Sequence, residues 1–243
     1  MPCKLCLQEK ELRNKSHIIP RQFFHKASKN IAKGFGNVSQ GDKVGRLYSK
    51  NTKSKQMQSG IHVPNILCGD CEQKLGVFDG YAQTVLLNNN DIEKHEGKGL
   101  CKIKKVDYKK LKLFFLSVLW RSQICKHDFF NEVNLTKDLE DELRDMIYGE
   151  APGDESDFSV LLLRYEGKEA NHFSVKKWQS PFEGYYFRIG NYTFIIKVDD
   201  QDFPSSFLQY ILTANSPLLI PITDYKATKD YELLINNIDL YKE

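Results

Sequence analysis

The chain has 243 residues, 41% of them hydrophobic and 28% charged, a composition typical of globular rather than disordered or fibrous proteins. It contains no run of 18 apolar residues and no apolar signal-peptide segment among its first residues, so we expect a cytoplasmic protein without membrane contact. Its formal charge of only +3, taken alone, argues against a protein that binds nucleic acid.

The charge is distributed unevenly along the chain. Residues 1–60 contain 13 Lys and Arg against three Asp and Glu, and residues 98–126 contain nine against one. Residues 61–97 carry two basic and six acidic groups, and residues 127–243 carry 11 and 22. The two basic stretches indicate a face that binds a polyanion, although a solvated lysine-rich surface is the simpler explanation of either stretch alone.

Four of the six cysteines form two C-x-x-C pairs, Cys3 with Cys6 and Cys68 with Cys71. In a reducing cytosol disulfides are disfavoured, and two such pairs are typical of a tetrahedral Zn²⁺ site with four thiolate ligands. A redox-active dithiol is the alternative, but neither pair lies between a predicted strand and helix. We therefore predict one structural Zn²⁺, with a substantial element in the 61 residues between the pairs.

The N-terminal elements are predicted from hydrophobic pattern. Residues 11–20 are typical of a short strand pair that ends at Pro20, and residues 21–31 of a helix with one apolar face. Residues 33–60 are rich in Gly, Ser, Asn, Gln and Lys, which predicts a long irregular loop. A helix is expected from Cys71, since apolar residues then recur with the helical period: Leu75, Phe78, Ala82, Val85 and Leu86.

The rest of the chain is predicted to be helical first and β-rich afterwards. Residues 107–130 form the strongest predicted helix, and a second helix begins after the N-cap Thr136. Residues 149–156 are typical of a linker. Strands are expected at residues 158–165, 185–189, 192–198, 208–212 and 218–222, the second and third joined across Gly190-Asn191.

A histidine and an acidic residue stand beside the cysteine pairs. His17 lies in the run SHIIP at residues 16–20, and Glu72 ends the run NILCGDCE at residues 65–72. Together with both C-x-x-C pairs, this ordered set over about residues 1–88 resembles the HNH, or ββα-metal (His-Me finger), nucleases, in particular their zinc-stapled branch. The resemblance implies an endonuclease that hydrolyses phosphodiester bonds of DNA.

The predicted fold class is α+β. Residues 1–97 are expected to form the HNH-like module, a zinc-stapled, treble-clef-like ββα-metal unit. Residues 98–243 are expected to form an α+β accessory domain, with a helical middle within 107–148 and strands within 158–222.

The resemblance also implies roles for single residues. His17 occupies the position of the general base, Glu72 that of a ligand to a catalytic Mg²⁺ or Mn²⁺, and Asn65 that of the middle Asn, which orients the base. Such a set suits the reaction, because phosphodiester hydrolysis needs an activated water and a cation that neutralises developing charge. The simpler explanations are a packed His17 and a Glu72 that merely favours the helix dipole.

The sequence departs from the family at the residue before the base. Ser16 stands where an acidic or His ligand is usual, and a hydroxyl is a poorer cation ligand than a carboxylate. Asp79, seven residues after Glu72 and hence on the same helix face, is a candidate for an additional ligand, or else a solvated acid.

Two other residues near the site have open roles. Asn65 lies nearer Cys68 than the family's middle Asn often does, so His62 is an alternative partner for the base. Arg121, among apolar neighbours, could reach a phosphate or pair with a carboxylate of the module, although a structural role is the simpler explanation.

The expected partner is DNA, with RNA not excluded. Phosphate contacts are predicted from the basic loop 21–55 and the basic helix within 98–126, through five residues in particular: Arg21, Lys26, Lys43, Arg46 and Lys109. The resemblance further suggests a role in restriction or antiphage defence, sometimes beside an ATPase. The alternative is a catalytically inactive zinc-stapled module that binds nucleic acid or protein.

Overall fold

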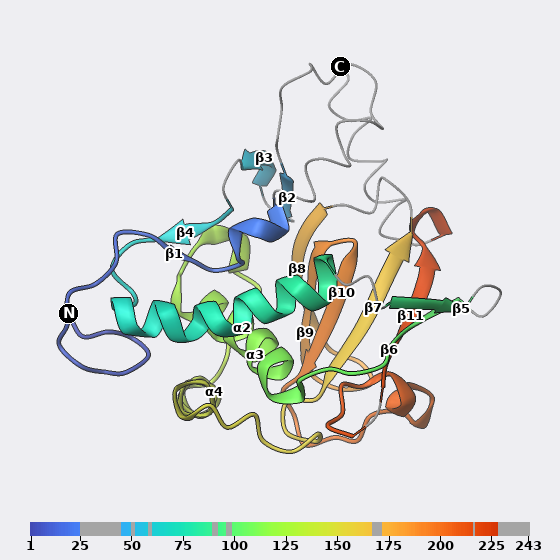
Figure 1. The fold of residues 1–243 in the computed structure, drawn as a ribbon. Coiled ribbons are helices and arrows are strands. Elements are labelled where there is room, and N and C mark those ends of the chain that lie inside the picture. The colour runs from blue at the N-terminus through green and yellow to red at the C-terminus, as the bar shows by residue number, and fades with distance from the viewer. Residues whose placement is uncertain are drawn as a thin grey trace, which may run out of the picture.

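A computed structural model of the chain describes residues 1–24, 45–49, 52–57, 60–88, 92–95, 99–166, 172–215 and 217–227. These residues combine helices and strands in an α+β fold, as predicted (Figure 1). None of the described helices is long and apolar enough to cross a membrane.

Nine of the described strands form one sheet, in the order β3-β2-β8-β9-β10-β7-β11-β6-β5. Neighbouring strands are antiparallel except in the pairs β2–β8 and β7–β11. The strands are β2 Gly45–Ser49, β3 Thr52–Met57, β5 Ile92–His95, β6 Leu100–Ile103, β7 Val160–Glu166, β8 His172–Trp178, β9 Gly184–Gly190, β10 Tyr192–Lys197 and β11 Leu218–Asp224. The predicted hairpin at Gly190-Asn191 is confirmed as the β9–β10 connection.

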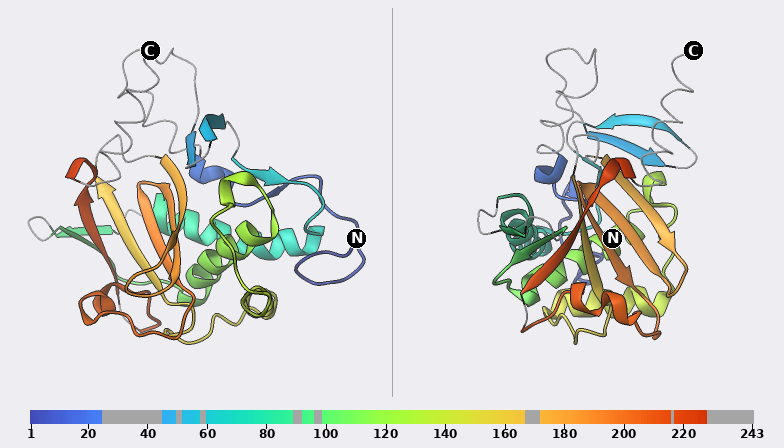
Figure 2. Two further views of the ribbon diagram at one scale, coloured as in Figure 1. Left: turned by 180° about the vertical axis from the view of Figure 1, so that it is seen from behind. Right: turned by 90° about the vertical axis from the view of Figure 1, so that its right-hand side faces the viewer.

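Three α-helices whose full length the structure describes accompany the sheet: α2 Gly69–Leu87, α3 Tyr108–Ile124 and α4 Lys137–Gly149. Helices α2 and α3 lie on one face of the sheet (Figure 2), and α3 packs against both α2 and α4. The Phe115 ring of α3 contacts the Phe194 ring of β10, with centroids 4.7 Å apart. Every residue of α3 from Leu111 to Ser122 is buried, so α3 is the central helix of the fold.

The opposite face of the sheet has its own small core, because alternate residues of a strand point to opposite sides. Ile195 and Leu161 contribute to this core, and the 3-10 helix η3 Ser205–Tyr210 packs on it through Phe207 and Tyr210. The predicted strand at 208–212 is therefore wrong: this segment contains the end of η3, and only Ile211 forms a bridge, to Leu161.

Other predicted elements have mixed outcomes. The helix expected from Cys71 is α2, and Thr136 caps α4 by accepting the Leu139 N–H at 3.4 Å, as predicted. The loop expected at 33–60 is wrong at Gly45–Ser49 and Thr52–Met57, which form β2 and β3. Strand β3 is the edge of the sheet and β2 lies between β3 and β8; the sequences of β2 and β3, GRLYS and TKSKQM, carry no alternating apolar pattern from which strands could be predicted.

The main hydrophobic core crosses the predicted boundary at residue 97. It includes Leu75 and Phe78 of α2 together with Phe114 of α3 and Phe194 of β10. Phe114 also stacks on Phe23, at a centroid separation of 5.6 Å. The two predicted regions thus share one core.

Candidate functional site

The four cysteines of the C-x-x-C pairs come together at the N-terminal end of α2. Their sulfur atoms all lie within 4.8 Å of one another; we call them the cysteine cluster, Cys3, Cys6, Cys68 and Cys71. Backbone hydrogen bonds hold the N-terminal turn beside the approach to α2, from Lys4 N–H to Ile66 O at 2.9 Å and from Arg13 N–H to Leu67 O at 2.8 Å. The predicted four-cysteine grouping is confirmed.

The surroundings of the cluster shift the pKa values of its thiols in opposite directions. Burial alone would raise the pKa of Cys3, but backbone N–H groups that include that of Cys68, at 3.3 Å from Cys3 Sγ, lower this pKa to about 7. In Cys71, burial and the neighbouring thiols raise the pKa, as expected when several thiolates crowd together without a cation. Four sulfur ligands in this arrangement can hold a metal ion such as Zn²⁺. Cys101 and Cys125 are buried elsewhere.

Two short strands and α2 form a β-β-α arrangement beside the cluster. Strand β1 (Ser16–His17) pairs antiparallel with β4 (His62–Val63), with Ser16 opposite Val63 and His17 opposite His62. The Ile18 N–H extends the pairing by donating to Ile61 O at 3.0 Å. Helix α2 follows β4 after a turn, so residues far apart in the sequence reach one site.

Ser16 and Glu72, both predicted as ligands of a catalytic cation, face each other between β1 and α2. Burial raises the pKa of Glu72, and the nearby Ser16 hydroxyl partly opposes this effect. Nevertheless, neither Ser16 Oγ nor Glu72 Oε1 makes a hydrogen bond of standard length and angle with any described group, although both atoms are buried. Unsatisfied buried oxygens are costly, and a carboxylate with a hydroxyl is a donor set that suits a hard cation retaining several waters.

His17 and His62 lie beside each other across the β1–β4 pair. Their ring centroids are 5.6 Å apart, both side chains are half-buried, and His62 Nδ1 lies 3.4 Å from Gly60 O. Asn65, the residue predicted to orient His17, is exposed in the turn before α2 with a φ of +60°. The structure therefore brings His62, the alternative, next to the predicted base.

Asp79 has a different partner from the one expected. Both of its carboxylate oxygens accept hydrogen bonds from Arg121 of α3, Oδ1 from Nη2 at 2.7 Å and Oδ2 from Nη1 at 3.0 Å. The use of Asp79 as an additional metal ligand stays a prediction, and Arg121 is the partner that the structure gives this carboxylate. From the sequence, Arg121 was expected either to reach a phosphate or to pair with a carboxylate of the module. The structure shows the second of these contacts.

The predicted phosphate-binding residues are only partly described. Lys26 and Lys43 lie outside the described residues, and of Arg46 only the backbone, in β2, is described. Arg21 is exposed, while Lys109 Nζ lies 3.4 Å from Glu150 Oε2.

The expectation that the basic helix grips DNA needs correction over residues 111–122. This segment is buried on all sides, with Lys112 and Arg121 inside the protein. An apolar sequence on every side of a helix favours burial rather than a surface position, and the two long cations reach polar partners within the fold.

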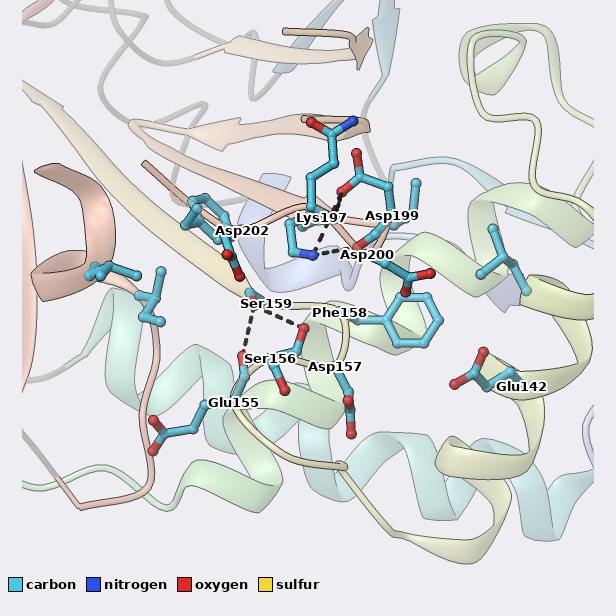
Figure 3. A pocket seen from close by; sticks show the side chains of 16 residues that line it. Glu142, Glu155, Ser156, Asp157, Phe158, Ser159, Lys197, Asp199, Asp200 and Asp202 are labelled. Atoms are coloured by element: carbon cyan, nitrogen blue, oxygen red, sulfur yellow. Dashed lines mark hydrogen bonds and ion pairs between the residues drawn. The ribbon is translucent and has the colours of Figure 1, made fainter. Parts of the chain in front are cut away.

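A separate cavity of about 370 Å³ lies between α4 and the loops that flank β7 and β10 (Figure 3). Lys197 is the one basic residue among the described residues that line it, and its ammonium lies 3.6 Å from Asp199 Oδ1. The carboxylates that line it are Glu142, Glu155, Asp157, Asp199, Asp200 and Asp202. An acidic cavity repels phosphate, and none of the candidate site residues lines it.

Comparison of the chain with models of protein families, with curated proteins and with solved structures finds no match.

Proposed function

We propose that the chain is a metal-dependent endonuclease of the HNH type that hydrolyses phosphodiester bonds of DNA in the cytoplasm. The carrying observation is that Ser16 and Glu72 meet as buried oxygens without standard hydrogen bonds, and that Ser16 directly precedes His17 in strand β1. The cysteine cluster at the start of the same helix supports the same proposal.

Zn²⁺ in the cysteine cluster would have a structural role. Four thiolates complete its tetrahedral coordination and leave no open position for a substrate or a water. The ion would fasten the N-terminal turn to the first turn of α2, as in a treble clef, and so fix the helix that carries Glu72.

Glu72 and Ser16 would hold Mg²⁺ or Mn²⁺, whose charge stabilises the phosphate and the leaving oxygen when it is bound. His17 would accept the proton of the attacking water, since an imidazole has a suitable pKa near neutral pH. His62, across the strand pair at 5.6 Å between ring centroids, would limit the orientations open to the His17 ring.

The proposed substrate is DNA, and phosphate contacts would come from exposed basic groups of the N-terminal region such as Arg21. The acidic C-terminal half, with 11 basic and 22 acidic residues, would face away from the DNA or toward a protein partner. A role in restriction or antiphage defence, with an ATPase as partner, extends this proposal.

Plasmid cleavage by the purified full chain with Mg²⁺ or Mn²⁺ tests the proposal. His17→Asn should abolish cleavage and leave DNA binding intact, because Asn cannot accept the proton. His127→Asn is the matched control: His127 Nδ1 accepts the Phe129 N–H at 3.1 Å as the N-cap of a 3-10 helix outside the site, and Asn supplies another acceptor.

Three outcomes would contradict parts of the proposal. Cleavage that survives His17→Asn would refute the mechanism. Binding without cleavage by the wild-type chain, with either metal, would favour the inactive binding module. Faster cleavage of RNA than of DNA would assign the other substrate.

A further inference from the structure

Arg121 has an unusual environment for an arginine. Its side chain is only 2% exposed, in the last turn of the central helix α3. All five N–H groups of its guanidinium have acceptors: Nε donates to Ser117 O at 3.2 Å, Nη1 to His17 O and Asp79 Oδ2 at 3.0 Å each, and Nη2 to Asp79 Oδ1 at 2.7 Å and Ser117 Oγ at 3.1 Å.

These contacts join three elements. Asp79 lies on α2, Ser117 on α3, and the His17 carbonyl belongs to β1. The hydrogen bond to the His17 carbonyl is the contact that matters for the site, because it reaches the backbone of the residue proposed as the base. The position of β1 relative to α2 is thereby fixed through one side chain.

A purely structural role explains this arrangement poorly. Burying a guanidinium and a carboxylate costs several kcal/mol of desolvation, and well-packed apolar residues often stabilise a core equally well or better. The neighbours of Arg121 along α3, Val118, Leu119 and Trp120, show that this core accepts apolar residues. What an apolar residue cannot supply is a directed hydrogen bond to β1.

We propose that Arg121 is a positioning residue of the nuclease site, which holds the strand that carries Ser16 and His17 in register with the helix that carries Glu72. The inference rests on the proposed function. It deepens that function by adding Arg121, which lies outside residues 1–88, the segment that resembles the family. Lysine cannot replace Arg121. A single ammonium cannot donate two parallel hydrogen bonds to the Asp79 carboxylate and also reach the His17 carbonyl and Ser117.

The test compares Arg121→Lys with wild type in the full chain. The rate constant kcat and the KM for cleavage of a DNA duplex are measured at saturating Mn²⁺, together with zinc content and melting temperature. We expect kcat to fall at least about 10-fold, as for other small displacements of catalytic groups, while KM changes less than about twofold and the zinc content stays unchanged.

A matched control and a milder variant complete the design. Arg144→Lys alters an arginine of α4 that pairs with Asp141 and Asp145, and should leave kcat unchanged. Ser117→Ala removes the Ser117 Oγ acceptor of the Arg121 guanidinium and should lower kcat a few-fold with KM unchanged. If Arg121→Lys does not fold, Ser117→Ala is used to test the proposal in its place.

The failures of the two proposals are distinguishable. A wild-type chain that does not cleave DNA refutes the proposed function. Cleavage by wild type with an unchanged kcat in the Arg121 and Ser117 variants, or a loss that follows only the fraction of folded or zinc-loaded protein, refutes the positioning role alone.

Discussion

Lys112 makes the stability of the protein depend on pH in a way that one substitution should remove. Its side chain is 1% exposed within α3, and its ammonium donates to Tyr108 Oη at 2.9 Å and to the Asp154 carbonyl. Burial lowers the pKa of Lys112 from 10.5 to about 8, although the nearby acidic groups, Asp157 first, oppose the shift.

The sign of the effect follows from proton binding. Below pH 8 Lys112 is charged in both the folded and the unfolded chain, so the full cost of burying the charge is present. Between pH 8 and pH 10.5 the folded protein has lost this proton and the unfolded chain still holds it, so the free energy of unfolding rises with pH. The difference between the two pKa values corresponds to about 3 kcal/mol.

Lys112→Met removes the titrating group and keeps most of the side-chain volume. Urea unfolding of wild type and variant at pH 7 and pH 10.5 gives the difference between their unfolding free energies, which should shift by about 3 kcal/mol in favour of wild type at the higher pH. The variant also loses the hydrogen bonds of the ammonium. This loss changes the free energy of unfolding by nearly the same amount at both pH values. Lys110→Met, an exposed neighbour paired with Asp107, should show no such rise. Parallel pH profiles of wild type and Lys112→Met would refute the reasoning.

Three further outcomes are expected. Gly60→Ala should destabilise the fold by about 1–3 kcal/mol in urea unfolding, because Gly60 has a φ of +78° and an added Cβ would lie 2.5 Å from the Phe24 ring. Gly76→Ala is the control and should not destabilise the fold, since an added Cβ there meets no atom within 4 Å. Equal effects of the two substitutions would contradict the packing described. Glu72→Gln should abolish Mn²⁺ binding in calorimetry yet stabilise the metal-free protein at neutral pH. Because burial raises the pKa of Glu72 above its ordinary 4.5, the folded state holds its proton more tightly and loses stability as pH rises through that range; a less stable variant at pH 7 would contradict this. Metal analysis should find about one Zn²⁺ per chain, removal of which by a chelator lowers the melting temperature; Cys101→Ser should keep the ion, and a metal content that survives serine at every position of the cysteine cluster would exclude the site.

The sequence predicted the parts of the site that depend on local chemistry. Two C-x-x-C pairs have few uses in a reducing compartment, so the cysteine cluster followed from spacing alone. That Ser16 and Glu72 would lie close together was an expectation from the resemblance over residues 1–88, in which Ser16 takes the place of a usual ligand. The partner of Arg121 was not determined in this way: Asp79 lies 42 residues away, and no local pattern selects it from the other acids.

The strands of the sheet also differ in how well local sequence patterns predict them. The hairpin β9–β10 carries its own turn signal and was found, whereas β8 (His172–Trp178), β2 and the edge strand β3 were not. Their sequences are mixed or polar, and they become strands because a neighbouring strand supplies hydrogen bonds. Helix α3 lies in the stretch predicted to be a basic helix, yet its Lys112 is buried, where Tyr108 Oη and the Asp154 carbonyl accept hydrogen bonds from its ammonium.

The central position of α3 also determines when the proposed site can be completed during synthesis. The residues that resemble a nuclease end near residue 88, but the guanidinium that joins β1 to α2 is added only at residue 121. At a synthesis rate of about 5–20 residues per second, the ribosome adds the intervening stretch within seconds, and α3 must then leave the exit tunnel and pack before the strand and helix are locked together. A nascent chain that stalls or is cleaved before that point would carry the whole motif without its internal support. If the chain acts on DNA as proposed, such a dependence would keep incomplete copies from cleaving the DNA of the cell that makes them.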